Sequence, residues 1–124
     1  MTEEELAEGV AAATRAYPRT RLLPPSGTLR PLRVSPVPIP AAFWGGGETR
    51  ALVVFDLASH ASARPRGLLG PEWRLPGGGA PYNASPVFEY AEAWQAYSWS
   101  FRWPPALDVV ATIEAYLGRF SDHR

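Results

Sequence analysis

The sequence predicts an α+β domain in which two amphipathic helices, one at each end of the chain, pack on a small antiparallel sheet. A capped apolar periodicity opens the chain, a β-branched and aromatic run lies near its middle, and a second periodicity follows a double proline near its end. The chain has 124 residues, of which 46% are hydrophobic and 19% charged. This composition predicts a single folded domain over residues 1–124.

The first helix is predicted over residues 2–16. Thr2 and Glu5 fit a capping box, in which each side chain satisfies one backbone N–H at the start of the helix. Apolar residues then recur at helical spacing and form one stripe: Leu6, Val10, Ala13 and Tyr17. Pro18 ends the helix, and Gly9 weakens it by roughly 1 kcal/mol relative to alanine.

The middle of the chain is expected to be extended. Residues 19–41 alternate prolines with apolar side chains. Because proline lacks the N–H that a sheet requires, this segment is an edge strand or a broken strand, with a polyproline-like connector as the alternative. Residues 51–57, Ala-Leu-Val-Val-Phe-Asp-Leu, form the strongest strand and are expected to be buried on both faces. Residues 67–75 are expected to contain another short strand.

A loop over residues 41–48 combines two aromatic side chains, Phe43 and Trp44, with three consecutive glycines. A glycine-rich phosphate loop would continue into a helix through a lysine and a hydroxyl residue, whereas Glu48 and a strand follow here. We therefore expect a flexible hairpin loop. Phe43 and Trp44 are expected to be exposed and are the candidate surface for a protein partner.

The end of the chain is expected to hold an irregular aromatic segment and then the second helix. Residues 87–97 carry aromatic side chains at a spacing compatible with a helix, and Glu89 and Glu92 within them are expected to be solvated charges. The helix is predicted over residues 105–118, with a broad apolar face. Asp108 lies in its first turn, where an acidic side chain is stabilised by the helix dipole.

The segment before this helix resembles a motif of the ubiquitin-conjugating (E2) superfamily. Its members carry Trp-x-Pro-Ala-Leu-x before their second major helix, and this chain has Trp103-Pro104-Pro105-Ala106-Leu107-Asp108. The wider pattern Trp-Gln-x-Tyr-Ser-x₄-Trp-x-Pro, which begins at Trp94 and spans Trp99, is similar to the bacterial group called prokaryotic E2 family E. The resemblance implies an E2/UBC-like fold and a packing role for this motif. It is absent over residues 58–65, where the family's Leu-Pro-x-x-Tyr-Pro pattern is missing.

The resemblance also identifies where E2 chemistry would lie, and this chain lacks it. E2 enzymes hold ubiquitin as a thioester on a cysteine upstream of the motif tryptophan. Counting back from Trp103 reaches the window Ala93, Trp94, Gln95 and Ala96, and the chain has no cysteine. Asn83, in Pro-Tyr-Asn, lies near the family's His-Pro-Asn motif, whose asparagine supports the oxyanion, but a turn-forming role is the alternative. No catalytic residue is assigned.

Composition excludes several other classes. The net charge is zero, and neither half of the chain has a basic excess, so neither nucleic acid nor a membrane surface is an expected partner. All twelve basic residues are arginine, which leaves the N-terminus as the only amine available for acylation. No cofactor or metal is expected, since His60 and His123 are far apart in sequence. With an acidic N-terminus and no long apolar run, a cytoplasmic protein is expected.

The sequence therefore predicts a non-catalytic, E2-variant-like component of a bacterial ubiquitin-like conjugation system. It would bind a ubiquitin-like modifier or an activating (E1-like) or conjugating enzyme. One alternative is an active E2 in which the cysteine has been substituted at Ala93 or Ala96. Others are a protein-interaction module unrelated to conjugation, and a small enzyme in which His60, Glu89 or Asp108 converge on a cleft near Trp73 and Tyr82.

Overall fold

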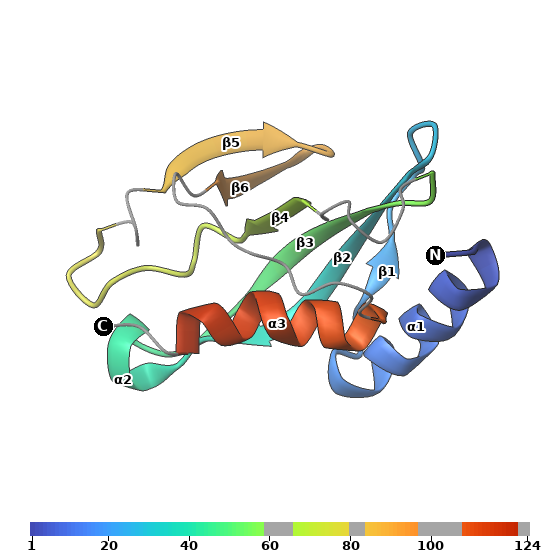
Figure 1. Ribbon diagram of the computed structural model, residues 1–124. Helices are drawn as coiled ribbons and strands as arrows, with labels where there is room; N and C mark the ends of the chain where they lie inside the picture. The colour runs from blue at the N-terminus through green and yellow to red at the C-terminus, as the bar shows by residue number, and fades with distance from the viewer. Residues whose placement is uncertain (59–65, 80–83, 97–107, 122–124) are drawn as a thin grey trace.

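The fold is a six-stranded antiparallel sheet with two long helices packed on one face, seen in a computed structural model (Figure 1). The structure describes residues 1–58, 66–79, 84–96 and 108–121. The strand order is β1-β2-β3-β4-β6-β5. In chain order the elements are α1 (Glu3–Ala16), β1 (Arg21–Leu22), β2 (Leu29–Pro38), α2 (Ala41–Trp44), β3 (Glu48–Asp56), β4 (Arg66–Leu69), β5 (Ser85–Glu89), β6 (Glu92–Ala96) and α3 (Val109–Ser121). The α+β prediction is confirmed.

Helix α1 begins with the predicted capping box. The Glu5 backbone N–H donates to Thr2 Oγ1 at 3.1 Å, and the Thr2 N–H donates to Glu5 Oε1 at 3.1 Å. These bonds hold the Glu5 carboxylate ionised and lower its pKa. Leu6 and Ala13 from the predicted stripe are fully buried against the sheet.

Strands β2 and β3 form the longest pairing of the sheet, with eight paired positions. Strand β2 is continuous over Leu29–Pro38, so neither the predicted break nor the polyproline-like connector is found, although the pairing shifts between Val34 and Val37, around Pro36. The prediction of an edge strand is also wrong, because β2 lies between β1 and β3. Strand β1 has only two residues and ends the sheet on that side.

Side chains of β3 alternate between two apolar clusters, as the pleat of a strand requires. Ala51, Val53 and Phe55 face the helices and join the larger cluster. Leu52 and Val54 face the other way and join a smaller cluster. Buried side chains from both helices complete the helix-side cluster: Leu6, Ala13, Val109, Ile113, Tyr116 and Phe120. Burial also raises the pKa of Tyr116 far above its ordinary value.

The expectation that Trp44 is exposed is wrong. Residues 41–44 form the short helix α2, and this turn directs Trp44 into the helix-side cluster, where it is 3% exposed. Its indole N–H donates to the Phe120 carbonyl at 2.7 Å, and its ring lies 6.0 Å from that of Trp73. Trp44 therefore closes the end of the core against α3 and offers no surface to a partner.

The expected irregular aromatic segment is in large part a regular hairpin, formed by β5 and β6. Tyr90 and Ala91 make its two-residue turn, both with positive φ (51° and 61°), which is the conformation of a type I′ turn. Such turns favour Asn-Gly. Because Tyr90 and Ala91 are neither of these residues, the sequence carries no signal for this turn. Alternation along β5 and β6 then places Val87 and Trp94 on one face and Phe88 and Ala93 on the other.

Helix α3 is positioned by two close approaches. A Cβ on Gly9 of α1 would lie 2.3 Å from Val109, and a Cβ on Gly67 of β4 would lie 2.4 Å from the Tyr116 ring. Only glycine permits such contacts. Asp108 caps the helix, because its Oδ1 accepts the Ala111 N–H at 2.7 Å, so its predicted structural role is confirmed.

Candidate functional site

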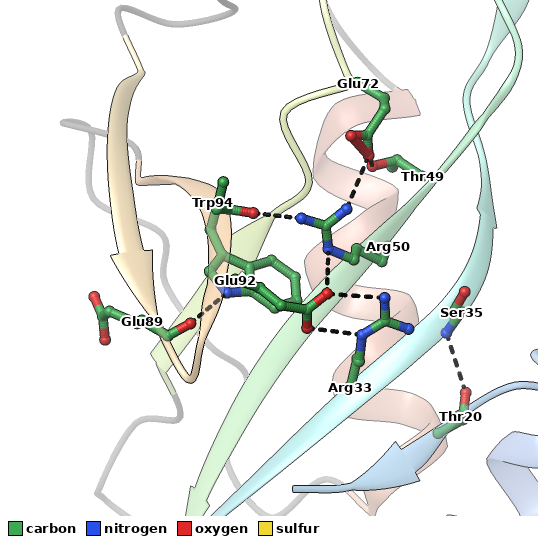
Figure 2. A network of polar contacts seen from close by, with 10 residues as sticks. Thr20, Arg33, Ser35, Thr49, Arg50, Glu72, Glu89, Glu92 and Trp94 are labelled. Atoms are coloured by element: carbon green, nitrogen blue, oxygen red, sulfur yellow. Dashed lines mark hydrogen bonds and ion pairs between the residues drawn. The ribbon is translucent and has the colours of Figure 1, made fainter.

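The most concentrated group of charged side chains lies on the sheet face opposite the helices, centred on Glu92 at the start of β6 (Figure 2). Two arginines face it from neighbouring strands. Arg33 of β2 is the cross-strand partner of Leu52 of β3, and Arg50 lies two residues before Leu52 on β3. Both arginines therefore lie on the same face of the sheet as Leu52, the face opposite the helices. We call Arg33, Arg50, Glu72 and Glu92 the arginine–glutamate network.

Glu92 is held by both arginines. Arg33 Nε donates to Glu92 Oε2 at 2.8 Å and its Nη2 donates to Oε1 at 3.0 Å, which is a bidentate pair. Arg50 Nε lies 3.2 Å from Glu92 Oε1. The hydrogen bonds from Arg33, with the positive charges of Arg33, Arg50 and Arg21, hold the pKa of Glu92 below its ordinary value. Glu92 is therefore a fixed carboxylate at neutral pH.

The guanidinium of Arg50 contacts several neighbouring groups. Besides Glu92, it contacts Glu72 Oε1 through Nη1 at 3.3 Å and donates from Nη2 to the Ala93 carbonyl at 2.5 Å. Its guanidinium carbon also lies 4.8 Å above the ring of Trp94, a cation–π geometry. Glu72 in turn accepts from Thr49 Oγ1 at 2.7 Å. Arg50 thus joins β3 to β6 and to the segment after β4.

The network fixes a hairpin that is weakly attached through its backbone. Strand β6 pairs with β4 at a single position, Leu69 with Gln95. In sheet order β6 is separated from β2 by β3 and β4, yet Glu92 contacts Arg33. In a flat sheet this separation would be about 14 Å. The hairpin therefore leans over the outer face of the sheet, where its Trp94, Val87 and Tyr90 take part in the smaller apolar cluster.

The window in which the cysteine of an E2 enzyme was expected lies on β6. Trp94 is 1% exposed and its indole N–H donates to the Glu89 carbonyl at 3.0 Å. Gln95 is buried, and its amide nitrogen donates to the carbonyls of Gly70 at 2.8 Å and Trp73 at 2.9 Å. Ala96 is half-buried, whereas Ala93 is exposed. Of the four side chains in this window, those of Trp94 and Gln95 are therefore buried and hydrogen-bonded to backbone carbonyls.

The remaining predicted site residues divide into two groups. Glu89 is not a solvated charge but is ion-paired with Arg66, and Asp108 caps α3, so neither is available as a free catalytic group. The others lie outside the described residues: His60, Tyr82, Asn83, Trp99, Trp103, Pro104, Pro105, Leu107 and His123. The side chain of Phe43 is likewise outside what the structure describes.

The chemistry of the network is structural rather than catalytic. A general base needs a pKa near the working pH and an open approach to substrate, whereas Glu92 is held ionised between two arginines. The network was missed in the sequence because its members are distant; Arg33 and Glu92 are 59 positions apart. The one available signal was the pair of acidic residues Glu89 and Glu92, which lie three positions apart.

Comparison with known proteins yields no relative. No protein-family model, curated protein or solved structure matches the chain significantly. None of the helices within the described residues has both the length and the apolar character that crossing a bilayer demands.

Proposed function

We propose that this protein is a non-catalytic, E2-like variant of a bacterial ubiquitin-like conjugation system, and that it acts by binding. The observation that carries the proposal is the motif Trp103-Pro104-Pro105-Ala106-Leu107, directly followed by Asp108 and the amphipathic helix α3. Its partner is a ubiquitin-like modifier, or the activating or conjugating enzyme that handles one.

The order of elements supports this proposal. An N-terminal helix, an antiparallel sheet and a C-terminal helix after the motif follow the order that the resemblance implies, although the sheet also contains the hairpin β5–β6. Helices α1 and α3 pack together on one face of the sheet. This order is shared by other α+β domains, so the motif remains the more specific signal.

The absence of a thiol supports binding over transfer. The chain has no cysteine, and no other side chain in the window Ala93–Ala96 can form a thioester. Trp94 and Gln95 are held by backbone carbonyls of neighbouring elements. A chain without lysine also offers no side-chain amine on which a modifier could be deposited, which suits a component that holds a modifier without becoming its target.

The test is a titration of the full chain with three proteins from the genome that encodes it: a ubiquitin-like protein, its activating enzyme and a cysteine-bearing conjugating enzyme. Isothermal titration calorimetry should detect binding of at least one with a Kd of roughly 1–100 μM, the range of transient complexes. An unrelated domain of similar size and zero net charge serves as the control. Failure of all three at about 1 mM would reject the proposal.

The competing proposal is an active E2 whose cysteine has been substituted. Ala93 is the exposed position of the window, and Ala96 is half-buried. Ala93→Cys and Ala96→Cys, each incubated with the modifier, the activating enzyme and ATP, should remain without a thioester if the protein is a binding variant. A thioester on either variant that reducing agents release would favour the active enzyme.

A further inference from the structure

Strand β5 forms one end of the sheet. It pairs with β6 along residues Ser85–Glu89, and no strand among the described residues lies along its other side. An edge strand presents unpaired backbone groups, which natural proteins protect or use for pairing. The opposite end, β1, has only two residues, so β5 is the longer free edge.

The backbone of Phe88 faces outward from this edge. Glu89 and Glu92 flank the two-residue turn and therefore form the hydrogen-bonded pair that closes the hairpin. Antiparallel pairs alternate, so the next pair, Phe88 with Ala93, does not exchange hydrogen bonds. Both the N–H and the C=O of Phe88 consequently point away from β6 and toward the free edge.

The side chain of Phe88 is also uncovered. It is 74% exposed, the highest value among the exposed large hydrophobic side chains of the described residues. Its cross-strand neighbour Ala93 is small and exposed and gives it no cover. One residue thus combines a free donor, a free acceptor and an aromatic ring, which are the elements of strand pairing with a cross-strand aromatic contact.

Pro86 restricts how a second strand could pair. It lies two residues before Phe88, at the next outward-facing position, and proline has no N–H. A partner strand centred on Pro86 would lose the donors of that pair. A strand centred on Phe88 instead uses the complete pair of outward groups. The edge therefore favours one register, in which Phe88 lies at the centre.

The charges near this edge are neutralised within the chain, which favours an identical partner. Glu89 is paired with Arg66, and Glu92 with Arg33 and Arg50. The chain as a whole has zero net charge and a pI near 6.7. Two copies therefore do not repel each other at neutral pH, whereas a charged partner would find no unpaired countercharge on these strands.

We propose that β5 pairs antiparallel with β5 of a second copy, with a two-fold axis between the two Phe88 residues. The two Phe88 backbones exchange two hydrogen bonds, and their rings lie directly opposite on one face. Because the contact is confined to one short strand, the dimer is weak, with a Kd of roughly 10–500 μM. This proposal does not rest on the proposed function.

Sedimentation equilibrium of the full chain tests the dimer. The wild type should show reversible, concentration-dependent dimerisation. Phe88→Arg places two like charges opposite each other and should weaken dimerisation by at least about tenfold, whereas the matched Phe88→Tyr should stay within about threefold of wild type. Both should keep the wild-type melting temperature, since Phe88 is 74% exposed.

A single-cysteine experiment locates the contact, because the chain has no thiol of its own. Phe88→Cys should oxidise to a disulfide-linked dimer at least about tenfold faster than Leu22→Cys on the opposite edge, since paired Cα atoms lie about 5.5 Å apart, within disulfide range. A wild type that stays monomeric at about 1 mM would overturn the proposal. So would a dimer that persists in Phe88→Arg, or equal oxidation rates of the two cysteines.

Discussion

The two faces of the sheet are held together by different means. On the helix side, sixteen buried residues from the helices, the strands and their connecting segments share one apolar cluster. On the outer side, five buried residues form the smaller cluster, and the hairpin that contributes Trp94 to it pairs with β4 at one position. Apolar burial and backbone pairing secure the first side, whereas the arginine–glutamate network and Trp94 secure the second.

This difference predicts graded stability within one small domain. Core helices and central strands open only with global unfolding, whereas an element held by few backbone contacts opens locally at lower free energy. Salt bridges add specificity of position but little net energy when solvent reaches them. We therefore expect the β5–β6 hairpin to be the first described element to detach, with α1, α3, β2 and β3 remaining folded.

The largest expected effect is on the helix side. Trp44→Ala removes a buried ring and the hydrogen bond to the Phe120 carbonyl, so it should lower the free energy of unfolding by about 3–5 kcal/mol. Leu75→Ala, at a side chain 37% exposed, is the control and should cost less than about 1 kcal/mol. Urea unfolding followed by far-UV circular dichroism measures both.

The sequence led to the opposite expectation for Trp44, that its replacement would spare stability, and its burial makes that expectation wrong. Trp103 lies outside the described residues, and from the packing role that the resemblance implies we predict that Trp103→Ala costs about 3–5 kcal/mol. A loss at Trp103 below about 1 kcal/mol in the same urea experiment would contradict it.

An intermediate effect is expected in the network. Glu92→Gln removes the charge that neutralises Arg33 and Arg50 and should cost about 1–2 kcal/mol. Hydrogen exchange should show the loss mainly at amides of β5 and β6. Glu48→Gln breaks the well-exposed pair with Arg19 and should cost less than about 0.5 kcal/mol. Equal losses in the two variants would remove the proposed distinction between the faces.

Acid should weaken the same attachment. The folded pKa of Glu92 lies below the ordinary value of 4.5. Its contribution to stability is therefore complete above pH 4.5 and is lost as the pH falls through the folded pKa. Amide exchange in β5 and β6, corrected for intrinsic rates, should accelerate below that pH relative to α1 and α3. Glu92→Gln should lack this difference, and its persistence there would assign the effect to another group.

The smallest effect is expected at the hairpin turn. Ala91 has a φ of 61°, which glycine adopts without strain, so Ala91→Gly should stabilise the protein by about 0.5–1 kcal/mol. Ala93→Gly, in the regular part of β6, is the matched control and should destabilise by a similar amount. Thermal unfolding of the two variants should shift the midpoint in opposite directions. A shift in the same direction would contradict the turn geometry.

Local signals in the sequence predicted the elements, and non-local contacts decided the rest. The capping box of α1 and the β-branched run of β3 are complete within a few residues, so both were predictable. The β5–β6 hairpin was not, because Tyr90 and Ala91 are unusual at positive φ and are tolerated where Tyr90 packs on the smaller cluster. The Glu92 contact with Arg33 depends on how the sheet curves, and no local pattern carries that information.

The close approaches at Gly9 and Gly67 have a consequence for the sequences that this fold accepts. Each contact admits no Cβ without displacing Val109 or the Tyr116 ring. A library of single substitutions screened for folding should therefore retain only glycine at both positions, although Gly9 by its helix propensity alone would favour replacement by alanine. Gly118, with nothing near its missing Cβ, should accept alanine freely. Substitutions such as Gly9→Ala, which helix propensity alone would favour, should therefore be absent from the folded variants.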